Sequence, residues 1–442
     1  MKVTYPVRML RNSTAALSGL VLACLAALVV AVACGGDQEA SRPTGTPAAT
    51  SAATAAARAP GVTDTEIVLG THAMLSGPKA LLVDLVPKAE ETYFKYVNEA
   101  RGGVCGRKIV FKLGDSQGDP ARALEVVRRL VEQDQVFAIV GGVGDMPHAA
   151  VWGYLNERGV PDLFIIAGGY RFGSDPQGHP WSVQLLPDFR SEGTSYGQYI
   201  SENLAGKKVA VLYENDDLGQ DGLAGLKAGL DPTKNQIVAE ESYEVTDVDI
   251  RPQIIRMANT GAEVAVLHTA GGFTAQAIKA ADRLGWHPRL FTTYVNADDS
   301  IFAFLPPKLV NGLISTQGMK LASWTDDPAI AQHYEIMRTY GGPTPSLFTI
   351  FGQAAAELTV EVLNRACANL TRKGVMDAVL SLKDYRSDLF VEGLSITYGD
   401  TDRAAFERGM RLVVATVENG KGKWEYLDSP THDSRINSPE FR

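Results

Sequence analysis

The chain has 442 residues, of which 45% are hydrophobic and 21% are charged, and its formal net charge at pH 7 is −9. This length exceeds one ordinary domain and allows the chain to bury two hydrophobic cores. The negative charge, without a basic cluster in the sequence, argues against a nucleic-acid partner.

Residues 1–33 are typical of an export signal. Basic residues precede an apolar segment, 15–33, which ends in small residues directly before Cys34. The pattern resembles a bacterial lipoprotein signal, which implies that Cys34 is lipidated and becomes the new N-terminus. Cys24 is a second candidate for this cysteine, and an uncleaved membrane anchor is the alternative. Each interpretation places the rest of the chain outside the cytoplasm.

Residues 34–60 are rich in Ala, Thr, Ser and Pro and contain scarcely any large apolar side chain. Such a segment cannot form a core. It predicts a flexible tether that holds a folded body at some distance from a membrane surface.

From residue 63 onward, short apolar runs alternate with stretches of helical periodicity. The predicted strands are 66–70, 108–113, 138–140 and 162–166, and the predicted helices are 81–101, 120–133 and 147–158. Strands that alternate with helices in this way are typical of a doubly wound parallel sheet.

The alternation starts afresh at residue 191. Helices are predicted at 191–204, 218–230, 249–259 and 272–284, and strands at 208–213, 236–243, 263–268, 289–293 and 312–316. Further helices at 328–340, 348–366 and 371–382 precede short strands at 395–398, 410–417 and 424–426. Two similar α/β lobes fit the usual size of domains better than one large sheet does.

The stretch 137–150, with the sequence FAIVGGVGDMPHAA, is a candidate ligand loop. A buried strand ends in glycines, and Pro147 is suited to the first turn of a helix. Such a junction presents backbone N–H groups and the positive end of a helix above the sheet, where open α/β folds bind ligands. The alternative is that these glycines serve only the turn.

No catalytic signature is present: the sequence lacks HExxH, G-x-x-x-x-G-K-[ST] and G-x-S-x-G. Gly142 and Gly144 begin like a dinucleotide-binding motif, but Pro147 occupies the place of its third glycine. We therefore expect no catalytic residue and no cofactor.

The seven histidines have no metal-ligand spacing, so we expect no metal site. His268 ends a predicted strand and could face a cleft, although a structural role is the alternative. The acid pairs Asp216–Asp217 and Asp298–Asp299 are most simply interpreted as solvated turns.

Several short motifs follow one another in a characteristic order. They are IVLG at 67–70, LSGP at 75–78, YFKYVN at 93–98, GGV at 102–104, GRKI at 106–109, DPARA at 119–123, LVE at 130–132, LNE at 155–157, GVP at 159–161, and Gly219 with Gly222. Together they resemble the type I periplasmic binding proteins, in the branch named for leucine, isoleucine and valine. The resemblance covers residues 63–426.

The resemblance implies two Rossmann-like α/β lobes joined by three crossovers, with lobe 1 at 61–188 and 318–390 and lobe 2 at 189–317 and 391–442. It also implies a solute-binding protein, not an enzyme, that closes on its ligand by a hinge motion. Its partners would be a small-molecule solute and the permease and ATPase subunits of an importer. The protein would be a monomer, held outside the cytoplasm by a lipid anchor. A tethered sensor is the alternative, and a secreted hydrolase is a more distant one.

The resemblance also implies which residues contact the ligand. Amino-acid binders of this family hold the carboxylate with hydroxyls on two loops of lobe 1 and the ammonium with an acid of lobe 2. Met146, Tyr170 and Val295 fall at three of those positions. A buried zwitterion without its partners is strongly disfavoured, so a small aromatic or organic acid is preferred over a branched-chain amino acid. Arg171 could pair with a carboxylate. The candidate ligand residues are Ser76, Asp145, Met146, Gly169, Tyr170, Arg171, Asn215, Leu218, His268, Tyr294 and Asn296.

Two further cysteines, Cys105 and Cys367, lie far apart in the sequence. Outside the cytoplasm such a pair can form a disulfide. Both residues fall in lobe 1 as the resemblance assigns it, which makes the bond feasible. Two buried free thiols are the alternative.

Overall fold

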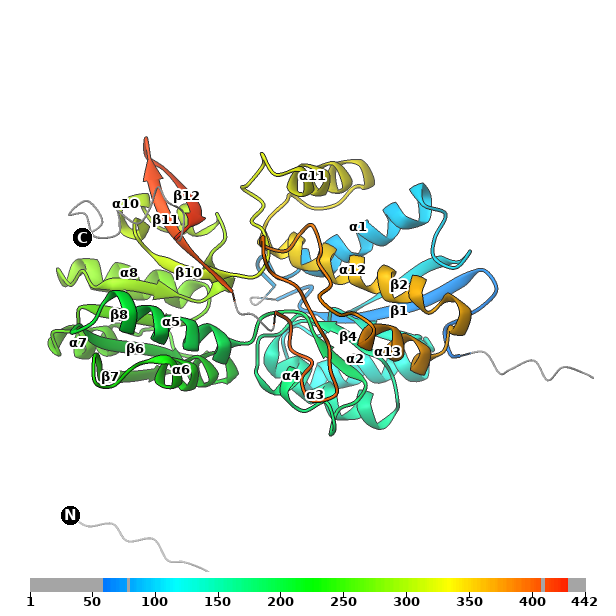
Figure 1. Cartoon of the computed structure of the whole chain (residues 1–442), viewed down its shortest axis with the longest axis horizontal. Helices are drawn as coiled ribbons and strands as arrows, with labels where there is room; N and C mark the ends of the chain where they lie inside the picture. Colours follow the sequence, from blue (N-terminus) through cyan, green and yellow to red (C-terminus); the bar gives the residue numbers. More distant parts are fainter. Residues whose placement is uncertain (1–58, 78–79, 407–409, 428–442) are drawn as a thin grey trace, which may run out of the picture. The chain divides into compact units, whose positions relative to one another are not determined.

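A computed structural model describes residues 59–77, 80–406 and 410–427. The predicted signal segment 1–33, Cys24, Cys34 and nearly all of the tether 34–60 lie outside these residues. The described part of the chain contains two β-sheets, each with its own helices (Figure 1).

The first sheet has five parallel strands in the order β2-β1-β3-β4-β5. Alternate residues of β1 face opposite sides, so that Ile67 and Leu69 pack in one core cluster with helix α1 and Val68 packs in another with helices α2 and α3. The elements are β1 (Glu66–Ala73), α1 (Leu85–Ala100), β2 (Lys108–Asp115), α2 (Pro120–Glu132), β3 (Ala138–Val140), α3 (Asp145–Glu157), β4 (Asp162–Ile165), α4 (Arg171–Ser174) and β5 (Ser182–Gln184).

The second sheet has seven strands in the order β12-β11-β10-β9-β8-β6-β7, parallel from β7 to β10 and antiparallel at β11 and β12. Its elements are α5 (Phe189–Asn203), β6 (Lys208–Glu214), α6 (Asp217–Gly229), β7 (Gln236–Tyr243), α7 (Arg251–Asn259), β8 (Val264–His268), α8 (Gly272–Arg283), β9 (Arg289–Thr292), η1 (Tyr294–Asn296), α9 (Ile301–Phe304), α10 (Pro307–Val310), β10 (Ile314–Gln317), β11 (Arg411–Glu418) and β12 (Lys421–Tyr426). Val209 and Val211 of β6 share a core cluster with residues of α5 and α6.

The chain passes between the two sheets three times. It leaves β5 for α5, and it returns after β10 to α11 (Pro328–Tyr340) and α12 (Leu347–Arg365), which pack against α1. It passes back to β11 after α13 (Arg372–Leu380). The second and third crossovers run antiparallel where Met319 pairs with Phe390. The predicted fold, two Rossmann-like lobes joined by three crossovers, is confirmed.

Most predicted elements are present, with differences at their ends. Helix α1 begins at Leu85, four residues later than predicted, and α3 begins at Asp145, two residues earlier. The predicted strand at 395–398 is wrong: only Ile396 forms a bridge, to Tyr385. Its apolar residues instead pack in the core beside lobe 1, where the hydroxyl of Tyr398 donates to the carbonyl of Gln184 at 2.7 Å.

Helices α5 and α6 pack unusually closely because glycines line their contact. A Cβ on Gly225 would lie 2.0 Å from the carbonyl oxygen of Arg190, and one on Gly193 would lie 2.1 Å from that of Gly222. Backbone atoms cannot move aside as a flexible side chain can. These glycines therefore fix the distance between two helices that cover one face of the second sheet.

We expect Gly225→Ala to lower the free energy of unfolding by about 1–3 kcal/mol, because it overpacks this contact. The matched control is Gly153→Ala in α3, where no atom of the described residues, apart from its chain neighbours and its own helix backbone, lies within 4 Å of the added Cβ. The control is expected to stabilise by about 0.5–1 kcal/mol through helix propensity. Urea denaturation of both variants tests this, and equal effects of the two substitutions would contradict it.

Cys105 and Cys367 are joined by a disulfide with an S–S distance of 2.02 Å. Of the two alternatives, the structure therefore shows the disulfide and not two free thiols. The bond links the turn between α1 and β2 to η2 (Cys367–Asn369), which follows α12. It therefore connects the start of lobe 1 to the segment that returns to it from lobe 2.

Candidate functional site

Loops at the carboxyl ends of strands in the two lobes meet directly. The loop after β4 supplies the N–H of Tyr170, which donates to Oδ2 of Asp221 in α6 at 2.8 Å. Arg171 of the same loop forms an ion pair with Asp217 at the start of α6. In parallel α/β folds this edge of the sheet is the one that binds ligands. The two edges thus approach each other through charged groups.

A second arginine reinforces this contact from the first turn of α5. Arg190 donates to Oδ1 of Asp221 at 3.0 Å, and its guanidinium lies 4.0 Å from the centre of the Tyr170 ring. Such stacking of a cation on an aromatic face is favourable. Both arginines near the contact therefore already have aspartate partners within the protein.

Carboxyl groups gather around the same contact. Asp145, the first residue of α3, accepts the N–H of Gly169 at 2.6 Å. Burial raises the pKa of Asp145 to about 7, and repulsion by Asp216 and Asp217 adds to this, whereas the N–H of Gly169 opposes it. Burial also raises the pKa of Glu214 to about 7, with repulsion by Asp216 as the next cause. The contact is therefore poor in cations relative to its carboxyl groups.

Several buried polar atoms have no hydrogen-bond partner among the described residues. At or near the carboxyl ends of strands they include atoms of Thr71, His72 and Gln184 in lobe 1 and of Thr293 and Gln317 in lobe 2. Others lie away from these ends, such as the carboxylate of Glu90 in α1 and the indole N–H of Trp152 in α3. Buried polar groups are normally paired, so the atoms at the carboxyl ends are ones that water or a ligand would complete.

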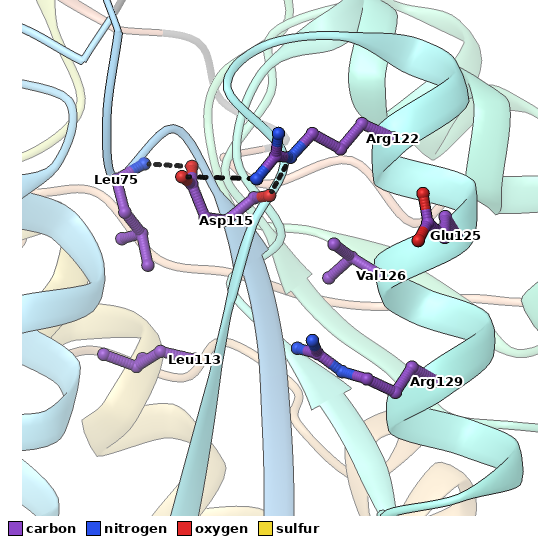
Figure 2. Close-up of a pocket in the computed structure, with 7 residues that line it drawn as sticks. All are labelled: Leu75, Leu113, Asp115, Arg122, Glu125, Val126 and Arg129. Carbon is purple, nitrogen blue, oxygen red and sulfur yellow. Dashed lines mark hydrogen bonds and ion pairs between the residues drawn. The ribbon is translucent and has the colours of Figure 1, made fainter.

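Ser76 lies beside a separate hollow in lobe 1. Its hydroxyl donates to Asp115 at 2.6 Å, and the N–H of Leu75 donates to the same carboxylate at 3.0 Å. Figure 2 shows this hollow, of about 470 Å³, between the end of β2 and the face of α2 that carries Arg122 and Arg129. Ser76 is thus held by lobe 1 itself and makes none of the contacts between the lobes described above.

Four of the predicted ligand residues make contacts within the protein that give them structural roles in this conformation. Tyr294 is 1% exposed, and its hydroxyl donates to the carbonyl of Pro187 in the first crossover at 3.1 Å. The amide of Asn296 donates to the carbonyl of Thr269 at 2.7 Å and to two threonine hydroxyls. Leu218 packs in the core. None of these three side chains offers a free polar atom to a solute.

His268 is the fourth. It is fully buried, and it shares the face of β8 that carries Val264 and Val266. A Cβ on Gly222 of α6 would lie 2.4 Å from its Nδ1, so the ring lies beneath that helix and not at a cleft. Burial lowers its pKa to about 3. Side chains alternate between the two faces of β8, and this alternation directs the ring of His268 toward α6.

The remaining predicted residues stay near the contact between the lobes. Met146 and Tyr170 are 38% and 37% exposed, Gly169 and Asp145 are hydrogen-bonded to each other, and Arg171 is paired with Asp217. Asn215 donates to Glu244 at 2.6 Å and accepts from Gln220 at 3.0 Å, within lobe 2.

The interpretation of the two acid pairs as solvated turns is wrong for Asp216, Asp217 and Asp298, whereas Asp299 is an exposed turn residue. Asp216 caps α6 by accepting the N–H of Gly219, and Asp217 forms the ion pair with Arg171. Asp298 is 7% exposed and accepts the N–H of Leu347 at 2.9 Å, at the start of α12. An aspartate directly before a predicted helix is a capping signal, and that signal could have identified Asp216.

A sequence model of the periplasmic binding protein family matches residues 45–423, most of the chain. The chain belongs to this family. A protein from Pseudomonas aeruginosa named "Amino acid binding protein" is 24% identical to it over 311 residues, which are 69% of this chain and 80% of that protein. The predicted relationship to the Leu/Ile/Val-binding proteins is confirmed by relatives from Brucella melitensis and Brucella abortus that are named Leu/Ile/Val-binding protein homologs.

Two solved periplasmic binding proteins have the same fold. The fatty acid ABC transporter substrate-binding protein from Thermomonospora curvata has a TM-score of 0.70 at 23% identity, and the match covers 87% of this chain and 97% of that one. A branched-chain amino acid ABC transporter protein from Thermus thermophilus, with bound valine, has a TM-score of 0.72 at 19% identity, and the match covers 85% and 99%. At these identities the likeness establishes the fold alone.

Proteins of this family bind solutes outside the cytoplasm and are not enzymes in general. Within the described ranges of this periplasmic binding protein, no helix combines the length and apolar character needed to cross a membrane. The groups that sequence reasoning missed are Arg190, Glu214 and Asp221. Each acts through a tertiary partner from another element, so nothing in the local sequence distinguishes it.

Proposed function

We propose that this protein is the solute-capturing component of an ABC importer, in which two lobes close on a small organic solute and present it to a permease. The observation that carries this proposal is the direct meeting of the two carboxyl edges through Arg171–Asp217 and Tyr170–Asp221. Contacts that join both lobes favour a closed state, and a ligand that touches both lobes shifts the population further toward it.

The proposal includes the route by which the protein reaches its site of action. Export by the segment 1–33, lipidation of Cys34 and a tether over 34–60 would leave one monomeric body near the outer face of a membrane. Radiolabelled palmitate incorporation in the bacterial host tests this. Label in the native chain and none in Cys34→Ser is expected, whereas equal label in Cys24→Ser and the native chain assigns the site to Cys34.

For the ligand, we propose a small aromatic or organic acid over a branched-chain amino acid. Met146 and Tyr170 are large, partly exposed side chains at the positions where amino-acid binders carry hydroxyls. They offer apolar and aromatic contact. Arg171 is paired with Asp217. A ligand carboxylate would take the place of Asp217 in this pair, so that Arg171 would be its cationic partner from lobe 1.

A calorimetric screen of amino acids and aromatic or aliphatic acids tests the proposal. We expect micromolar binding of at least one acid and no binding of leucine or valine at that concentration. Arg171→Ala is expected to weaken binding of the acid about fivefold, since a partly exposed charged pair contributes roughly 1 kcal/mol. Micromolar binding of leucine or valine would contradict the ligand class but not the transport function.

A further inference from the structure

Carboxyl groups of both lobes flank a single glycine. A Cβ on Gly169 would lie 3.1 Å from Oδ1 of Asp145 and 3.2 Å from Oδ2 of Asp217. Asp145 begins α3 in lobe 1, and Asp217 begins α6 in lobe 2. The two acids therefore come together only where the lobes meet, and they separate when the lobes part.

The other groups that face Asp145 do little to balance its charge. They are Glu214, Asp216 and Asp217 from β6 and α6, His148 from its own helix, Tyr294 from η1, and Arg171 from α4 through Asp217. Arg171 is already paired with Asp217, and His148 is hydrogen-bonded at 3.0 Å to both His72 and Asp162. Among the described residues, the N–H of Gly169 donates to Asp145 and stabilises its ionised form.

Closure changes the environment of this carboxyl group. In an open form Asp145 would be hydrated and distant from α6, with a pKa near the ordinary value of about 3.9. In the closed arrangement burial and the two aspartates raise its pKa to about 7. A group that binds a proton more tightly in one conformation shifts the equilibrium toward that conformation as the pH falls.

We propose that closure of the two lobes takes up one proton at Asp145, so that the closed state is favoured at acidic pH and weakened at alkaline pH. This inference rests on the hinge closure of the proposed function, but not on the identity of the ligand. The raised pKa belongs to the closed form, so protonation of Asp145 stabilises the closed form relative to the open form. This stabilisation is complete below about pH 4 and is lost as the pH rises through about 7.

The Glu214–Asp216 pair is a second proton site, but it lies within lobe 2. Burial is the main cause of both raised pKa values; repulsion by Asp216 raises the pKa of Glu214 further, whereas the hydrogen bond with Glu214 lowers the pKa of Asp216. Tyr243, also in lobe 2, donates to Glu214 at 2.5 Å. Opening the lobes changes these contacts less than those of Asp145, so Asp145 dominates the linkage.

Distance measurements between spin labels on the two lobes, without ligand, test the proposal. Leu81→Cys and Val248→Cys place labels at side chains that are 69% and 90% exposed. Cys24→Ser and Cys34→Ser remove other thiols, and the disulfide protects Cys105 and Cys367. We expect the ratio of closed to open populations to be at least tenfold higher at pH 5 than at pH 8.

Asp145→Asn keeps the acceptor for Gly169 and removes the charge. In this variant the ratio of closed to open populations is expected to change less than twofold over the same pH range. Asp175→Asn, at an exposed acid of the same lobe, is the matched control and should retain the full dependence. Asp216→Asn preserves a helix cap and removes one charge that repels Asp145. In this variant the closed-to-open ratio should depend less steeply on pH than in the native protein. This second variant tests the mechanism if Asp145→Asn fails to fold.

Three results would overturn the inference. Two distance populations that do not change with pH would leave the hinge intact and remove the proton linkage. A closed population that grows as the pH rises would indicate that closure needs the ionised acids. A single distance at every pH would remove hinge closure itself, and with it the mechanism of the proposed function.

Discussion

Replacing Gly169 with leucine is expected to weaken binding of the ligand found by calorimetry about 100-fold or more. The position of its Cβ already lies 3.1–3.2 Å from a carboxyl oxygen of each lobe, so a branched side chain has no space in the closed state. The substitution would keep the lobes apart and leave the closed form sparsely populated. Apparent affinity falls in proportion to the population of the binding-competent state.

The matched control is Gly153→Leu, because the Cβ position of Gly153 has no neighbour within 4 Å among the described residues. It should bind as the native protein does, and both variants should melt within a few degrees of it. Unchanged affinity in Gly169→Leu, with its fold intact, would mean that the ligand does not require this contact between the lobes.

Removing the disulfide with Cys105→Ser and Cys367→Ser is expected to lower the free energy of unfolding by about 2–4 kcal/mol. The bond spans 262 residues, and a long closed loop restricts the unfolded chain strongly. Denaturation in urea measures the change. Adding a reductant to the native protein should reproduce the midpoint of the double variant.

Ligand affinity provides the control for this second prediction. The disulfide joins the α1–β2 turn to η2, and neither cysteine is among the residues that meet between the lobes. Affinity at a temperature where both proteins are folded should therefore change less than twofold. A decrease in the free energy of unfolding of less than about 0.5 kcal/mol would contradict the prediction, because it would mean that the bond hardly reduces the conformational entropy of the unfolded chain.

The sequence predicts the fold well because its signals are local and repeated. Asp119 before Pro120 predicts the start of α2, and its carboxylate accepts the N–H of Arg122 at 2.8 Å. The apolar run at 138–140 is β3, fully buried, and it leads through glycines into α3. Helix ends are less well predicted, as at Leu85, because turn residues ahead of α1 share its apolar spacing.

The candidate site is predicted only in outline, because its groups are defined by their tertiary partners. The loop after β4 was identified, yet the ion pair that engages Arg171 joins it to Asp217, 46 positions later in the chain. His268 could be placed at the end of a strand, but its direction depends on which face α6 covers. Likewise, the ring of Tyr294 packs against Phe189 of α5 and Phe351 of α12.

A small solute is proposed to bind between the lobes, against residues of both. The decisive measurement is a crystal structure with the ligand identified by calorimetry. We expect a ligand in contact with the loops that carry Asp145 and Tyr170 in lobe 1 and with the start of α6 in lobe 2. A ligand held entirely by lobe 1, such as in the hollow beside Arg122 and Arg129 (Figure 2), would contradict it.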